Sequence, residues 1–209
     1  WMPDDFGVYV TADNVSDHLA GSLTAQPMDA AENSAQVPIL MYHHIVEEDD
    51  GSGSVTVDQF RAQMDALLDA GYTTVSLQEL ADYVNHGGDL PEKPVAITFD
   101  DGYASNYELA YPILRERNMK ATIFVIGVSV GKDTYKDTDH AMTPHFSYEQ
   151  AAEMVSSGLI SVQSHTYDMH QWAPYESGDQ VRENILPMAG ESETDYVAAL
   201  TGDFTTSRD

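Results

Sequence analysis

The sequence predicts an α/β fold built on a parallel β-sheet. Five apolar, strand-like segments begin near residues 37, 72, 95, 121 and 159, and segments with helical periodicity separate them. Strands that alternate with helices in this way form parallel sheets, either open or closed into a barrel. The chain has 209 residues, of which 42% are hydrophobic, and this is enough for one domain with a buried core.

Residues 1–36 do not fit this pattern. They contain six acidic residues and no lysine or arginine, and their apolar residues follow no sustained period. Only residues 8–10 have the composition of a short strand. We therefore expect an acidic, poorly ordered linker or stalk at 1–36 and a folded domain at 37–209. Such a stalk would join the domain to an anchor or a further domain upstream of residue 1.

The first half of the domain is expected to begin with a strand at 37–42. A polar, glycine-containing loop at 47–54 follows, and Asp58 is expected to cap a helix with apolar residues on one face. A glycine ends that helix, and residues 72–75 form the next short strand. Ser76 then begins a capping-box pattern that starts a second helix. The inward face of the first helix is predicted to carry Phe60, Met64, Leu67 and Leu68.

The centre of the domain is a strand at 95–99, predicted to be buried on both faces because all five residues are apolar or β-branched. A helix over 104–117 is expected to break at Pro112, which has no N–H to donate. A strand at 121–126 follows. The polar segment 128–146 then carries two histidines that we interpret as exposed loop residues, His140 and His145.

The last part of the chain repeats the same alternation. Ser147 begins a second capping-box pattern and a fourth helix, and a strand is predicted at 159–164. Residues 171–191 have the composition of a loop. Ser192 is expected to start a final helix.

Two adjacent carboxylates, Asp100 and Asp101, come directly after the central strand. Burying either one without a partner would cost several kcal/mol. The pair must therefore meet a metal ion, a cation, a shared proton or open water. An isolated Asp-Asp-Gly is also common as a simple polar turn at the end of a strand.

A second group of polar residues follows the strand at 159–164. It contains His165, Asp168 and His170. Together with the two aspartates after the central strand, these residues offer the nitrogen and oxygen ligands that zinc and similar divalent ions prefer. Two histidines five positions apart would point roughly 140° apart on an ideal helix. They can therefore converge on one ion only from a loop.

Each candidate catalytic residue at a strand end lies just past the C-terminal end of its strand. These residues are His43, Asp100, Asp101 and His165. Parallel α/β folds and barrels place their active sites at this edge. The pattern alone therefore predicts one site there.

The motifs in combination resemble the polysaccharide deacetylases, the NodB-homology or carbohydrate esterase 4 family. Residues 98–103 read Thr-Phe-Asp-Asp-Gly-Tyr and residues 164–170 read Ser-His-Thr-Tyr-Asp-Met-His, which are similar to the first two motifs of that family. Residues 37–45 read Val-Pro-Ile-Leu-Met-Tyr-His-His-Ile. This segment and the histidine spacing resemble the branch that de-N-acetylates poly-β-1,6-N-acetylglucosamine in biofilms. The resemblance covers roughly residues 37–209.

The resemblance implies a parallel (β/α) barrel of the NodB-homology type. The family continues with an Arg or Tyr-Pro-x-Gly-type motif that lines the acetyl pocket, and with strands that close the barrel. Neither occurs before Asp209. Five predicted strands are too few to close such a barrel. We therefore expect a domain that lacks its C-terminal strands, in a fragment of a longer enzyme.

The resemblance also implies a role for each residue of the site. Asp100 is the general base, and His43 protonates the leaving amine, because it matches the Tyr-His position of the biofilm-polymer branch. His44 is less suited, since adjacent strand residues point to opposite faces. The expected ion is zinc, with nickel, cobalt or iron(II) as alternatives. Its implied ligands are Asp101, His165 and His170. Sugar contacts are expected of three aromatic residues, Tyr103, Trp172 and Tyr175.

The function implied is metal-dependent hydrolysis of N-acetyl groups from an N-acetylglucosamine-containing polysaccharide, with release of acetate. Peptidoglycan, chitin oligomers or another acetylated glycan are alternative substrates. A further alternative is a non-catalytic surface protein that keeps the metal site and binds glycan. The family implies a location outside a bacterial cell or at its surface.

Composition argues against several other partners. Nine Lys and Arg residues against 35 Asp and Glu residues give a formal net charge of −26, and such a surface repels nucleic acid and anionic lipid. No apolar run approaches the roughly 20 residues of a membrane helix. The chain has no cysteine, so disulfides and thiolate ligands are excluded. The charge suits solubility or a salty habitat, or retention of a polymer that becomes cationic as acetyl groups leave.

Overall fold

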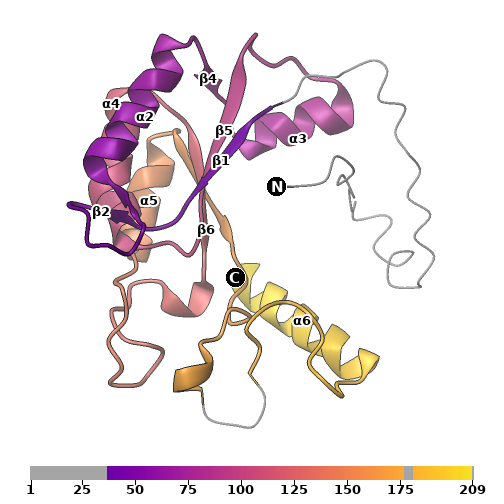
Figure 1. Ribbon diagram of the computed structural model, residues 1–209. Helices are drawn as coiled ribbons and strands as arrows, with labels where there is room; N and C mark the ends of the chain where they lie inside the picture. Colours follow the sequence, from indigo (N-terminus) through magenta and orange to yellow (C-terminus); the bar gives the residue numbers. More distant parts are fainter. Residues whose placement is uncertain (1–36, 177–180, 209) are drawn as a thin grey trace. The chain divides into compact units, whose positions relative to one another are not determined.

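The computed structural model describes residues 37–176 and 181–208 (Figure 1). The linker predicted at 1–36 and the short strand predicted at 8–10 lie outside the described residues. The boundary between linker and domain therefore stays a prediction. Among the described helices, none is both long and apolar enough to cross a membrane.

The predicted parallel sheet is confirmed. Its strands run in the order β1-β5-β6-β7, and β4 pairs with the start of β5, always in parallel. Within the described residues the sheet is open, because β1 and β7 stand at its two ends, so closure into a barrel is not seen. The strands are β1 (Ile39–Tyr42), β4 (Thr73–Thr74), β5 (Pro94–Phe99), β6 (Ala121–Val125) and β7 (Ile160–Ser164).

The register of the sheet brings the C-terminal ends of its strands together. Tyr42 of β1 lies opposite Phe99 of β5, and Val125 of β6 lies opposite Ser164 of β7. The residues that follow these strands therefore leave the sheet at one edge. All six residues of β5 are buried, as the apolar run predicts.

The sequence pattern did not predict two further strands of two residues each. Strands β2 (Ile45–Val46) and β3 (Val55–Thr56) pair in parallel as a small separate sheet. They flank the polar loop predicted at 47–54. Both residues of β2 are buried, so this small sheet fixes the chain directly after the first strand of the site.

Three of the helices carry capping boxes. Helix α3 (Leu77–His86) begins after Ser76 and α5 (Tyr148–Ser156) after Ser147, as predicted. The start predicted for α2 (Val57–Asp69) was wrong: its cap is Thr56 rather than Asp58. The hydroxyl of Thr56 accepts from the Gln59 N–H, and the Gln59 side chain accepts from the Thr56 N–H, so two otherwise unpaired donors are satisfied together.

The interruption predicted near Pro112 is present as a π-helical turn. A π-helix spans Asn106–Ala110, and α4 (Tyr111–Glu116) continues from it with the proline in its first turn. The Tyr111 N–H bonds to the carbonyl of Asn106, five residues back. Such turns often mark functional sites. Here Asn106 is buried, and its amide donates to the carbonyl of His43 at 2.8 Å.

The core lies between the sheet and the helices α2, α4 and α5, which Figure 1 shows on one side of it. Phe60 and Met64 of α2 pack there with Phe99 of β5, whereas Leu68, also predicted to face inward, is 41% exposed. Leu67 packs against the core in its place.

The remaining elements are short turns and the last helix. Helix α6 (Glu193–Arg208) begins after Ser192, whose hydroxyl accepts from the Asp195 N–H. The 3₁₀ turns are Gly127–Ser129 and Ala173–Tyr175.

Candidate metal centre and active site

The turn after β5 holds Asp101 in an uncommon backbone conformation. Its φ is 71°, in the left-handed region that non-glycine residues rarely adopt. Gly102 follows with φ 83°, and a Cβ there would lie 2.8 Å from Cγ1 of Val125. The turn therefore requires glycine at 102. It leaves the side chain of Asp101 only 11% exposed at the edge of the sheet.

The two histidines come from one loop that follows β7. The His165 N–H donates to the carbonyl of Val125 at 2.8 Å, which ties the start of the loop to β6. Thr166 has φ 71°, so the chain turns sharply directly after the first histidine. The hydroxyl of Thr166 accepts from the Met169 N–H at 3.1 Å, which closes the loop before His170.

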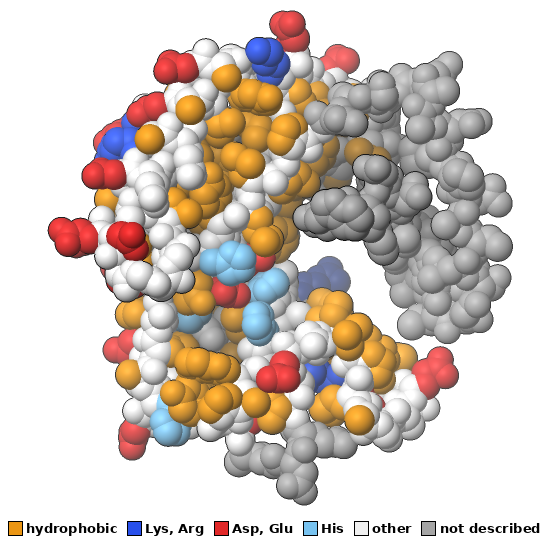
Figure 2. Space-filling model, viewed as in Figure 1, with side chains coloured by type: hydrophobic (Ala, Val, Ile, Leu, Met, Phe, Trp, Pro, Cys, Tyr) orange, Lys and Arg blue, Asp and Glu red, His pale blue; other side chains and the backbone are white. Residues whose placement is uncertain are grey.

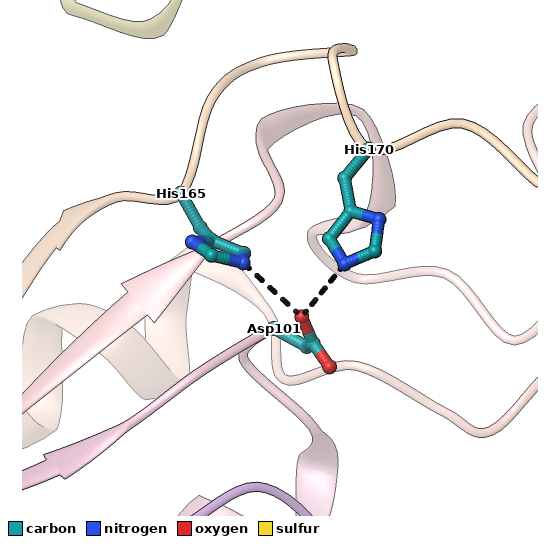
Figure 3. A group of neighbouring side chains, drawn as sticks. All are labelled: Asp101, His165 and His170. Carbon is teal, nitrogen blue, oxygen red and sulfur yellow. Dashed lines mark ion pairs between the residues drawn. The ribbon is translucent and has the colours of Figure 1, made fainter. Parts of the chain in front are cut away.

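These two turns bring three side chains together. Figure 3 shows the rings of His165 and His170 directed toward the carboxylate of Asp101. Their Nε2 atoms lie 3.7 and 3.9 Å from Oδ1 of Asp101. One ligand atom from each residue falls within 4.8 Å of the other two.

The three residues fit a divalent metal ion. Ligand atoms about 2.1 Å from a tetrahedral ion lie roughly 3.4 Å from one another, so the observed spacings need only a small inward movement. Oδ1 of Asp101 is buried and has no hydrogen-bond partner within the described residues. A buried carboxylate oxygen without a donor, placed between two imidazole nitrogens, is suited to a cation. Three protein ligands leave positions open, as catalytic sites do.

His43 and Asp100 form a second pair beside the first three residues. Nε2 of His43 lies 3.9 Å from Oδ2 of Asp100. The side chain of His43 is 49% exposed and that of Asp100 is 17% exposed. The pair is therefore open to a substrate on the histidine side. The Asp100 N–H donates to the carbonyl of Tyr42, so the sheet itself fixes the pair.

His44 points away from this pair. Its Nδ1 lies 2.8 Å from the hydroxyl of Ser105, which also accepts from the Ile45 N–H. Burial lowers the pKa of His44, and the charge of Asp50 opposes this only in part. His44 is therefore placed to hold the turn after β1.

Tyr103 lies between two histidine rings. Its ring centroid is 5.3 Å from that of His44 and 5.0 Å from that of His145. Burial, and then the charge of Asp101, raises the pKa of the Tyr103 phenol well above its ordinary value. This phenol stays protonated at neutral pH, and the half-buried ring forms a wall of the site.

The interpretation of His145 as an exposed loop residue was wrong. His145 is half-buried, and its Nδ1 is buried without a partner in the described part of the chain. The cause is an antiparallel bridge between Tyr103 and His145, which places the 128–146 segment against the turn after β5. Burial lowers the pKa of His145, against the opposing charge of Asp101. His140 is exposed, as expected.

The other two aromatic residues lie on the loop after His170. Trp172 is 51% exposed and meets Tyr175 edge to face at 4.7 Å. Tyr175 is half-buried, and its ring stacks on His140 at 4.2 Å. Trp172 is therefore the freer of the two to meet a ligand. Figure 2 shows histidines gathered around acidic side chains in the middle of this face, with hydrophobic side chains above and below them.

A shallow groove of about 340 Å³ lies next to His44. Its walls are mainly apolar, and two carboxylates stand among them. The apolar lining includes Ile45, Val46, Ala104, Leu109 and Pro144, and the carboxylates are those of Glu47 and Glu108.

Two residues near the histidine loop carried no signal in the sequence. Lys136 donates to Asp168, within the loop, at 2.9 Å, and it also donates to Glu176. Burial alone would lower the pKa of Lys136, but the hydrogen bonds to the two carboxylates have the larger effect and raise it. Asp203 of α6 accepts two hydrogen bonds from the same loop.

Comparison with known proteins identifies the family. Residues 87–206 match the family model of polysaccharide deacetylase. The chain is 42% identical to the Bacillus subtilis protein YxkH over 137 residues, which are 66% of this chain and 44% of that protein. It is 34% identical over 117 residues to the poly-β-1,6-N-acetyl-D-glucosamine N-deacetylase of Staphylococcus aureus, covering 56% of this chain and 38% of that enzyme. The chain therefore spans less than half the length of these curated relatives.

Solved structures agree with this match. IcaB from Ammonifex degensii superposes with a TM-score of 0.65 and 30% identity over 82% of this chain and 66% of IcaB. A de-N-acetylase from Aggregatibacter actinomycetemcomitans gives a TM-score of 0.65 and 27% identity over 82% of this chain and 72% of its own. With the family model matching more than half of the chain, the protein belongs to the polysaccharide deacetylase family.

Proposed function

We propose that the protein is a metal-dependent N-deacetylase of an N-acetylglucosamine polymer similar to poly-β-1,6-N-acetylglucosamine, and that it releases acetate. The observation that carries this proposal is the unpartnered oxygen of Asp101 between His165 and His170, directly beside the pair of Asp100 and His43. The relatives named above support the choice of glycan.

The chain supplies a base and an acid that face each other. Asp100 takes a proton from the water that attacks the acetyl carbonyl, and protonated His43 donates a proton to the leaving amine. Their 3.9 Å separation lets both reach the same scissile amide. A divalent ion held by Asp101, His165 and His170 would polarise the acetyl carbonyl and acidify water; zinc is our first choice.

The surroundings of the site suit a polymer. His43 and His170 are 49% and 50% exposed, so a sugar within a long chain can approach without threading into a deep pocket. Trp172 offers an exposed ring on the loop after His170, and a groove lies beside His44. We propose that these hold sugars next to the reacting one. Such polymers lie outside the bacterial cell, so the proposal places the protein there or at the cell surface.

Acetate release tests this proposal. The chain, loaded with zinc, is incubated with oligomers of β-1,6-N-acetylglucosamine, with chitin oligomers and with peptidoglycan. We expect release from the first substrate, loss of release in EDTA, and recovery with added zinc. The variant Asp100→Asn should keep its metal and lose roughly 10²- to 10⁴-fold in rate.

The other outcomes are informative. Faster release from chitin oligomers or peptidoglycan would replace the proposed substrate. Stoichiometric metal with no acetate from any glycan, both in this chain and in a version extended at its C-terminus, would favour a non-catalytic glycan-binding protein.

A further inference from the structure

The loop between the two histidines is attached to the rest of the protein mainly through its backbone. Its residues 166–169 lie beyond the end of β7, so the sheet offers them no partners. On one side, the carbonyls of Thr166 and Tyr167 accept from the N–H groups of Gly127 and Val128 at 3.0 and 2.9 Å. These bonds attach the loop to the 3₁₀ turn Gly127–Ser129, which follows β6.

One carboxylate holds the other side of the loop. Oδ1 of Asp203 accepts from the Tyr167 N–H at 2.8 Å, and Oδ2 accepts from the Asp168 N–H at 2.7 Å. Both oxygens are used, and on two consecutive peptide groups. Bonds from amides to an ionised acceptor are short and about twice as strong as bonds between neutral groups. Asp203 therefore fixes the orientation of the middle of the loop.

The interactions of Asp203 are with this loop. Within the described residues, it forms no ion pair with Lys, Arg or His. No side chain of α6 is buried in the core. The helix instead contributes the carboxylate of Asp203, and the nearby Ser207 hydroxyl contacts Ser164 at the end of β7.

The two bonds sit midway between the metal-ligand candidates. Tyr167 is two residues after His165, and Asp168 is two residues before His170. A rotation of either peptide group would move one imidazole relative to the other. The distances from the two Nε2 atoms to Asp101, 3.7 and 3.9 Å, depend on the loop staying as it is.

We propose that Asp203 is a positioning residue that sets the metal affinity and ligand geometry of the site through the backbone of the histidine loop. This inference rests on the metal site in the proposed function. Removing a group that hydrogen-bonds to a metal ligand and orients it typically lowers metal affinity roughly 10- to 100-fold. Asp203 acts on both histidines at once, so its loss is expected to fall in this range.

The test measures metal binding directly in the full 209-residue chain. Zinc affinity is determined by competition with a chromophoric chelator, and the visible spectrum of the cobalt(II)-loaded protein reports ligand geometry. Asp203→Ala removes both acceptors, whereas Asp203→Asn keeps one acceptor and turns an amide N–H₂ toward the second peptide N–H. The matched control is Glu193→Gln, which removes one exposed carboxylate from the same helix.

The expected zinc affinity falls roughly 10- to 100-fold in Asp203→Ala and less in Asp203→Asn, and both variants shift the cobalt spectrum. Glu193→Gln should bind as the unchanged chain does. Circular dichroism shows whether each variant is folded, and if Asp203→Ala is not, Asp203→Asn decides. Unchanged affinity and spectrum in the folded Asp203 variants would overturn the inference, and so would an equal loss in Glu193→Gln.

The result is separable from that of the proposed function. If the unchanged chain binds zinc but releases no acetate, the proposed deacetylase activity is contradicted. The zinc and cobalt measurements still decide the role of Asp203. If the unchanged chain binds no metal, both the proposed function and the proposed role of Asp203 are contradicted.

Discussion

Replacing Asp101 with asparagine should stabilise the metal-free protein and abolish its stabilisation by metal. Asp101 is 8% exposed, and its Oδ1 has no hydrogen-bond partner within the described residues. Asparagine keeps the shape of the side chain, removes its charge and tolerates the φ of 71°. The substitution therefore removes a buried charge, one oxygen of which has no hydrogen-bond partner within the described residues, without creating a cavity.

An unsatisfied buried polar group costs about 1–3 kcal/mol, and a charged one costs more. Asparagine keeps a polar atom there and removes only the part due to charge, so the metal-free variant should gain about 1 kcal/mol. For a domain of this size that is a rise of roughly 2–4 °C in Tm. Zinc at about 100 times its Kd should stabilise the unchanged chain by about 2.7 kcal/mol. Asp101→Asn should show little of that shift.

Thermal unfolding followed by circular dichroism, at pH 8 in EDTA and again in zinc, measures both effects. Asp137→Asn is the control, because the side chain of Asp137 is fully exposed, and its two curves should match those of the unchanged chain. A metal-free Asp101→Asn protein that is less stable than the unchanged chain would show that the carboxylate is already satisfied without metal. An undiminished shift with zinc would show that Asp101 is not a ligand.

Two further predictions concern histidines beside the site. His43→Ala should slow N-acetyl substrates at least about tenfold more than activated acetate esters, whose leaving groups need no proton; equal losses in the two assays would assign His43 a structural role. Burial lowers the pKa of His145 in the folded chain. As the pH falls below about 6.5, the ordinary pKa of histidine, the unfolded chain therefore binds more protons at this imidazole than the folded chain does. The free energy of unfolding should therefore decrease from pH 8 to pH 5.5, and His145→Gln should weaken that dependence in urea titrations performed in EDTA; an identical pH dependence would contradict this.

The parts of the site that could be predicted are those fixed by local sequence. Asp100 and Asp101 end a strand whose apolar run is unambiguous, and His165 ends another. Once the strands alternate with helices, parallel pairing puts these ends at one edge. The cap of α2 is also encoded locally, because Thr56 and Gln59 form the capping-box pattern, which outweighs the capping tendency of Asp58.

The parts that could not be predicted depend on how loops pack. His145 meets Tyr103 only because the 128–146 segment folds back on the turn after β5. Asp203 is one of 35 acidic residues, and its importance arises from two peptide groups 36 and 35 positions earlier. Such contacts cannot be predicted from periodicity or spacing, because each of them involves a loop, and loop sequences have no regular hydrophobic pattern.

Two kinds of unfavourable local geometry occur at one edge of the sheet: positive φ at non-glycine residues, and a buried oxygen without a hydrogen-bond partner among the described residues. Four non-glycine residues in the described chain have positive φ: Asp101, Asn118, Lys136 and Thr166. Asparagine and aspartate tolerate that conformation better than other residues, whereas Lys136 and Thr166 each cost roughly 1–3 kcal/mol. Asp101 and Thr166 lie in the two turns that form the site, and Lys136 binds the histidine loop. The same edge holds the unpartnered oxygen of Asp101. Strain and an unsatisfied charge that gather at one strand edge, while the core obeys the rules, are typical of a functional site. Asp101 and Thr166 also lie within the two segments, 98–103 and 164–170, that are similar to the family motifs.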